Sequence, residues 1–143
     1  MKYKISLLTL IIFTFLAACT EIKDIHIEMD LPLKVQNDNE FIITVKLKNL
    51  ADKSQELVSI DIGDDYLKGI AIIKTEPSYN NSIHIPIDNS VSYSFEKDVA
   101  SGDSIVVRFY CKTILVGDFS DEIDFCINSD YNFLTKMART IVE

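Results

Sequence analysis

Apolar residues fall on every second position in two stretches near the end of the chain. The residues that show this alternation are Ile105, Val107, Phe109 and Cys111, then Ile123, Phe125 and Ile127. A period of two places alternate side chains on opposite faces of a strand, so each stretch predicts a β-strand with one face in the core. Because Val116-Gly117-Asp118 between them resembles a turn, we expect Ser104–Asn128 to be a central β-hairpin.

The same alternation predicts further strands, at residues 25–29, 41–48, 58–62, 83–87 and 91–95. The apolar run at 70–75 and the mixture of Thr, Met, Ile and Val at 133–142 predict two more. Pro32 and Pro86 indicate sheet edges, because proline cannot donate to a neighbouring strand. Asp64–Gly69 begins with acids and ends with glycine, which predicts a helical turn. About seven to nine short strands without a long helical period predict a single all-β sandwich.

The first nineteen residues have the pattern of a signal peptide. Lys2 and Lys4 precede an apolar run, Ile5–Phe15, which is too short to span a bilayer of about 30 Å. Leu16-Ala17-Ala18-Cys19 then resembles the lipobox of bacterial lipoproteins. The resemblance implies cleavage before Cys19 and attachment of diacylglycerol, with palmitate-type acyl chains, to its thiol. We therefore expect a signal peptide at 1–18, a lipidated tether at 19–24 and the sandwich domain at 25–143.

The anchor also implies a location. Several acyl chains, at about 0.8 kcal/mol per buried CH₂, hold a protein on a membrane permanently. Thr20 stands where the resemblance would place an Asp in lipoproteins retained at the inner membrane of diderm bacteria. We expect a bacterial cell-envelope protein, held in the outer membrane of a diderm host or on the outer face of the cytoplasmic membrane otherwise.

Charge excludes one class of partner. The full chain carries a net charge of −8, and removing residues 1–18 takes away Lys2 and Lys4 and no acid, which gives −10. Nucleic acids and anionic headgroups are bound through Lys and Arg that neutralise phosphates. An acidic domain is therefore not expected to bind nucleic acid, and lipid rather than charge would hold it at the membrane.

Four features occur in an order that resembles a known group of domains. They are a strand that ends in Leu47-Lys48-Asn49, a loop and strand at Val58–Ile62, a turn at Ala100–Asp103 and a hairpin turn at Val116–Phe119. Their order resembles the immunoglobulin-like domains of bacterial surface proteins, such as the CARDB and DUF11 groups, over roughly residues 30–130. This resemblance implies an immunoglobulin-like fold with a binding or spacer role and no catalytic residue.

The cysteines after Cys19 give two alternatives. In a regular hairpin Cys111 faces the core and Cys126 faces outward beside Tyr110, with Lys112 opposite Asp124, so both thiols stay free. A one-residue bulge would instead bring Cys111 and Cys126 within the roughly 4 Å between β-carbons that a disulfide needs. Disulfides persist in exported proteins, so both alternatives stay open.

Acidic residues gather in two parts of the chain. One group is Asp61, Asp64 and Asp65, and the other is Asp118, Asp121, Glu122, Asp124 and Asp130. Neither has the spacing of a calcium-binding EF-hand, so a solvated acidic surface is expected rather than a metal site. His26 and His84 are the two histidines, and neither accompanies a nucleophile motif.

These observations predict a membrane-anchored, non-catalytic immunoglobulin-like module that binds an envelope protein or glycan, or serves as a structural part of the envelope. No cofactor is expected. The alternative is a lipoprotein subunit of an envelope-spanning secretion or transport assembly.

Overall fold

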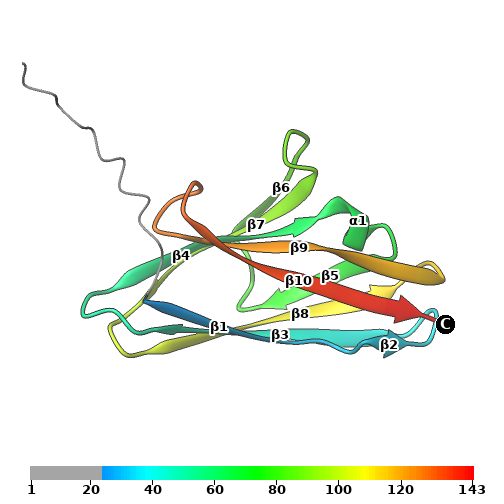
Figure 1. Ribbon diagram of the computed structural model, residues 1–143, viewed down its shortest axis with the longest axis horizontal. Helices are drawn as coiled ribbons and strands as arrows, with labels where there is room; N and C mark the ends of the chain where they lie inside the picture. The colour runs from blue at the N-terminus through cyan, green and yellow to red at the C-terminus, as the bar shows by residue number, and fades with distance from the viewer. Residues whose placement is uncertain (1–23) are drawn as a thin grey trace, which may run out of the picture.

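Two β-sheets pack face to face in the computed structural model, which describes residues 24–143 (Figure 1). Within this range there are ten strands and one short helix. They are β1 (Ile25–Asp30), β2 (Lys34–Val35), β3 (Glu40–Asn49), β4 (Gln55–Gly63), α1 (Asp64–Leu67), β5 (Ile70–Glu76), β6 (Asn81–Ile85), β7 (Ser90–Val99), β8 (Ser104–Thr113), β9 (Gly117–Ile127) and β10 (Phe133–Val142). The predicted signal peptide and Cys19, the predicted site of lipidation, lie outside the described residues.

The strand order defines a sandwich with unequal sheets. One sheet has the order β1-β3-β8-β5, and the other has the order β2-β10-β9-β4-β7-β6. Neighbours are antiparallel except β2 and β10, which are parallel. The predicted all-β sandwich is confirmed, as are the helical turn after β4 and the edge positions of β1 and β6.

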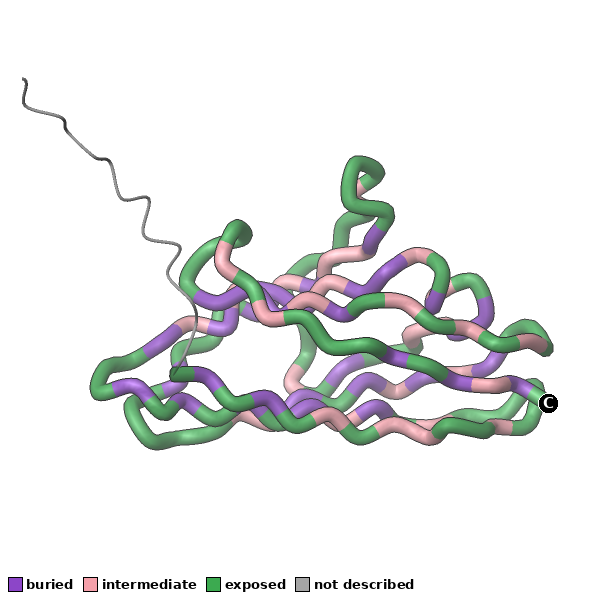
Figure 2. The backbone as a smooth tube through the Cα atoms, viewed as in Figure 1, coloured by how far each residue is buried: buried purple, intermediate pink, exposed green. Residues whose placement is uncertain are grey.

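Alternation of side chains builds the core between the sheets, and buried and exposed positions follow one another along most strands (Figure 2). The two central aromatic residues come from opposite sheets. Phe109 on β8 is 1% exposed and Phe125 on β9 is fully buried. The Phe109 ring makes edge-to-face contacts with Tyr93 and Phe95, at centroid distances of 5.7 and 6.2 Å. Such geometry adds to the hydrophobic contribution of the rings.

The central hairpin prediction is wrong. Strands β8 and β9 do not pair, since β8 lies between β3 and β5 while β9 lies between β10 and β4 in the other sheet. The intervening residues, Ile114–Val116, carry the chain from one sheet to the other. Alternation shows that one side of each strand faces the core. It does not show whether two such strands pair within one sheet or face each other from opposite sheets.

The side-chain pairs derived from that hairpin are wrong with it. Lys112 lies opposite Glu40 and forms an ion pair with Asp38 at 2.7 Å. Asp124 lies between Thr135 and Asp61 in the six-stranded sheet.

A bulge in β4 sets which residues face outward. The pairing of β4 with β7 and β9 shifts between Leu57 and Ser59, so Leu57 joins Ile60 in the core. Val58, which the simple alternation assigned to the same face as Ile60, instead lines the outer surface. Bulges change side-chain direction in this way.

Candidate functional site

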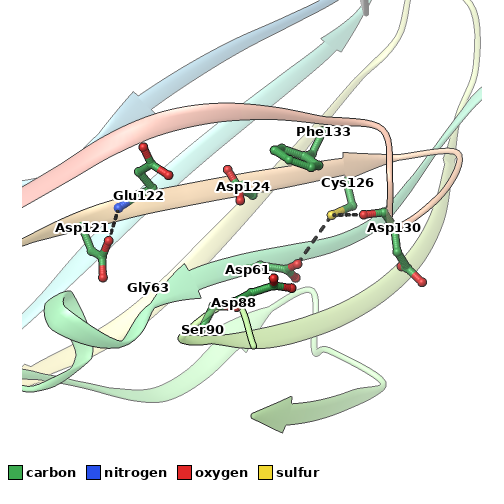
Figure 3. A pocket seen from close by; sticks show the side chains of 10 residues that line it. All are labelled: Asp61, Gly63, Asp88, Ser90, Asp121, Glu122, Asp124, Cys126, Asp130 and Phe133. Atoms are coloured by element: carbon green, nitrogen blue, oxygen red, sulfur yellow. Dashed lines mark hydrogen bonds between the residues drawn. The ribbon is translucent and has the colours of Figure 1, made fainter. Parts of the chain in front are cut away.

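A cleft of about 300 Å³ lies on the outer face of the six-stranded sheet (Figure 3). Its walls are formed by strands β4 and β9, by the turns before β7 and β10, and by the first residue of β10. The lining residues are Asp61, Gly63, Asp88, Ser90, Asp121, Glu122, Asp124, Cys126, Asp130 and Phe133. Six of these ten carry carboxylates, and within the described chain no Lys, Arg or His is among them.

The fold brings together the two acidic groups seen in the sequence. Asp61 on β4 lies directly opposite Asp124 on β9, and Asp88 and Asp130 approach from the turns that precede β7 and β10. The sequence pattern did not predict that β4 and β9 are neighbours. The nearness of the two groups could therefore not be predicted.

Asp121 closes one end of the cleft. Its carboxylate accepts hydrogen bonds from the backbone N–H groups of Asp65 at 2.9 Å and Glu122 at 2.8 Å. Gly63 makes this position available, because a β-carbon there would overlap the Asp121 carboxylate. The Asp121 side chain thus holds the start of α1 against β9 and is occupied by backbone donors.

Cys126 lies on the cleft side of β9 but is only 1% exposed. Its Sγ lies 3.6 Å from Asp61 Oδ2 and 3.9 Å from the Asp130 carbonyl oxygen. Burial raises the pKa of the Cys126 thiol to about 12, so the thiol is protonated at neutral pH and supplies no thiolate nucleophile. The expected exposed position beside Tyr110 is wrong.

Both cysteines of the described chain are free. Cys111 is buried in the core and belongs to the four-stranded sheet, whereas Cys126 belongs to the six-stranded sheet and faces away from the core. The bulge and disulfide alternative is not formed, because the two strands are not neighbours.

Asp61 and Asp124 form a pair of like charges directly across β4 and β9, an arrangement that destabilises a sheet. Oδ1 of Asp61 is buried and has no hydrogen-bond partner in the described structure. Burial raises the pKa of Asp124, and the nearby Glu122, Asp61 and Asp88 carboxylates raise it further. A hydrogen bond of 2.5 Å from the Thr135 hydroxyl opposes this shift.

We expect Asp124→Asn to stabilise the domain at neutral pH, by a few tenths to about 1 kcal/mol, because a half-exposed carboxylate is partly screened by water. The folded state binds the Asp124 proton more tightly than the unfolded chain does, so the penalty of the charged form fades as the pH falls through the raised pKa. The gain should therefore shrink at acidic pH. Urea unfolding at neutral and acidic pH tests this, with exposed Asp52→Asn as the matched control. A loss of stability at neutral pH would contradict it.

A larger groove of about 690 Å³ adjoins the cleft along β6 and β7. One wall carries Ile83, Ile85 and Ile87, and the other carries Tyr131 and Phe133. The floor between them is made by short side chains, namely Ser59, Ser92 and Ser94 together with Asp61. Small residues on the outward face of β4 and β7 leave this part of the sheet hollow, and the lining combines the isoleucines and aromatic rings with the carboxylates of Asp88, Glu96 and Asp130.

The histidines lie outside the cleft. His84 on β6 contacts Asp64 of α1, with Nε2 to Oδ2 at 2.8 Å, and thereby ties the edge strand to the helix. His26 lies on β1 of the other sheet, near Glu28. Over residues 24–143, no three His, Cys, Asp or Glu side chains are grouped to hold a metal ion. The same residues contain no helix with the length and apolar character needed to cross a membrane.

Comparison with known proteins defines the fold. No family model matches the chain, and no curated protein matches it. The VesB protease of Vibrio cholerae superposes with a TM-score of 0.50 at 7% identity, over 85% of this chain and 32% of that one. The C-terminal domain of the AgI/II polypeptide BspA of Streptococcus agalactiae superposes with a TM-score of 0.50 at 12% identity, over 82% of this chain and 49% of that one.

The chain therefore spans about a third of the first of these proteins and about half of the second. At such identities the likeness shows the fold alone, because one fold carries many functions. Together with the two packed sheets, it defines an immunoglobulin-like β-sandwich.

Proposed function

We propose that this chain is a lipid-anchored, non-catalytic binding module of a bacterial cell envelope. The observation that carries the proposal is the position of Cys19. The lipobox-like Leu16–Cys19 ends just before residues 20–24, and the first strand of the sandwich begins at Ile25. A lipid on Cys19 would hold the domain close to the membrane surface, in the outer membrane of a diderm host.

The arrangement of the sandwich supports this role. Strand β1 begins toward one end of the long axis, and the C-terminus lies at the opposite end (Figure 1). A lipid before β1 would therefore place one end of the sandwich toward the membrane and leave the outer faces of both sheets open to envelope partners.

The chemistry of the cleft favours binding over catalysis. The Cys126 thiol is protonated, and neither histidine lines the cleft of the described chain. Six carboxylates around a cavity that adjoins an apolar groove can attract and hold a cationic group instead.

We expect Cys19→Ala to abolish lipid attachment completely, because the thiol is the acceptor. Metabolic labelling with a radioactive or alkyne-tagged fatty acid measures this, and the variant should also run as a longer, uncleaved precursor. Cys126→Ala is the matched control and should keep its label. Label that persists in Cys19→Ala would overturn the anchoring proposal.

A further inference from the structure

We propose that the outer face of the six-stranded sheet binds an extended, basic segment of another envelope protein, in which Lys or Arg alternates with apolar residues. The basic side chains would enter the acidic cleft, and the apolar residues would lie against the groove walls. This inference rests on the binding role proposed above and names the partner of that site.

Charge complementarity determines the basic character of the partner. Among the described residues, the Asp88 and Asp130 side chains have no hydrogen bond or ion pair, and Oδ1 of Asp61 is buried without a donor. Asp61 and Asp124 repel one another across the strands. Two like charges directly opposite one another destabilise a sheet, and such unfavourable pairs are expected at functional sites. An ammonium or guanidinium group bound between the two carboxylates would reduce this repulsion.

The walls determine the apolar character of the partner. Ile87, in the turn after β6, is 88% exposed, and Tyr131, in the turn between β9 and β10, is 94% exposed; β4 and β7 lie between these parts of the sheet. The aliphatic stems of Lys and Arg pack on apolar surfaces while their charged ends reach polar groups. The Phe133 ring lies at the border of cleft and groove, where a cation can also contact its face.

The shape of the groove favours an extended segment. The groove runs over the outer face of β4 and β7, with β6 along one side and the turn between β9 and β10 along the other. In an extended segment, alternate side chains point to the same side at about 6 to 7 Å spacing. The basic residues on one side of the segment would then face the cleft, and the apolar residues on its other side would face the isoleucines along β6.

The test uses the full chain in detergent and a fluorescent peptide of roughly ten residues in which lysine and valine alternate. Fluorescence anisotropy should show binding that weakens as salt is added. The double variant Asp88→Asn with Asp130→Asn should weaken binding by at least about tenfold. Asp30→Asn with Asp52→Asn removes the same charge from exposed positions elsewhere and should change it less than about twofold.

Three results of the peptide assay would overturn the proposal. They are the absence of peptide binding, an equal loss in both double variants, and equal binding of a peptide whose valines are replaced by serine. Sedimentation of the chain without peptide tests whether a second copy of the chain occupies the groove instead. Self-association that disappears in Asp88→Asn with Asp130→Asn would assign the groove to that second copy and would also overturn the proposal. The peptide-binding assay does not depend on the lipid. Absence of peptide binding would therefore leave the anchoring proposal standing, and absence of acyl labelling would leave the peptide proposal standing.

Discussion

Phe109→Ala and Phe125→Ala should each lower the free energy of unfolding by about 3 to 5 kcal/mol. The two rings fill the centre of the sandwich from opposite sheets, and both are almost completely buried. Removing either leaves a cavity that the stiff sheets cannot close, and loss of Phe109 also removes its edge-to-face contacts with Tyr93 and Phe95.

Arg108→Ala is the matched control, because Arg108 is exposed and precedes Phe109 on the same strand. Its effect should stay within about 0.5 kcal/mol. Urea unfolding followed by circular dichroism measures all three variants. Equal and small effects at Phe109, Phe125 and Arg108 would show that the alternation does not define the core.

Asn49→Ala should cost about 2 to 4 kcal/mol, because its buried side chain joins two loops at one end of the sandwich. The amide nitrogen donates to the carbonyl oxygens of Lys53 at 2.8 Å and Val99 at 2.9 Å. The amide oxygen accepts from the backbone N–H of Ala51 at 2.9 Å. Alanine would remove all three bonds, two of which are fully buried, and would leave the Val99 carbonyl oxygen with only one side-chain hydrogen bond, of 3.3 Å, from the Ser54 hydroxyl.

Asn37→Ala is the control for Asn49→Ala, since Asn37 is exposed. Its effect should stay below about 0.5 kcal/mol. Thermal unfolding of both variants measures the difference. A loss at Asn49 no larger than the loss at Asn37 would contradict a structural role for the buried amide.

Local patterns predicted most of the strands. Alternation predicted β3 and β9, residue types predicted β10, and the prolines predicted that β1 and β6 lie at edges, because these properties depend on a residue and its near neighbours. The pairing of strands was not predictable in the same way. The alternation of β8 and β9 is compatible with a hairpin and with two strands in opposite sheets, and the structure adopts the second arrangement.

The site shows the same limit. The sequence showed two groups of acids, but their meeting in one cleft depends on the pairing of Asp61 with Asp124 across β4 and β9. The outward face of β4 depends in addition on the bulge near Ser59, which no residue pattern indicated. Cys126 is buried because the turn that contains Asp130 lies over it. The alternation within β9 alone cannot predict that a later turn covers this side chain.

Hydrogen–deuterium exchange of the full chain, with and without the lysine–valine peptide, tests the central claim most directly. The account predicts slower exchange in β6 and in the turn between β9 and β10, which border the groove, and unchanged exchange in β1 and β3 of the opposite sheet. Slower exchange confined to β1 and β3, or no change in β6 at saturating peptide, would contradict it.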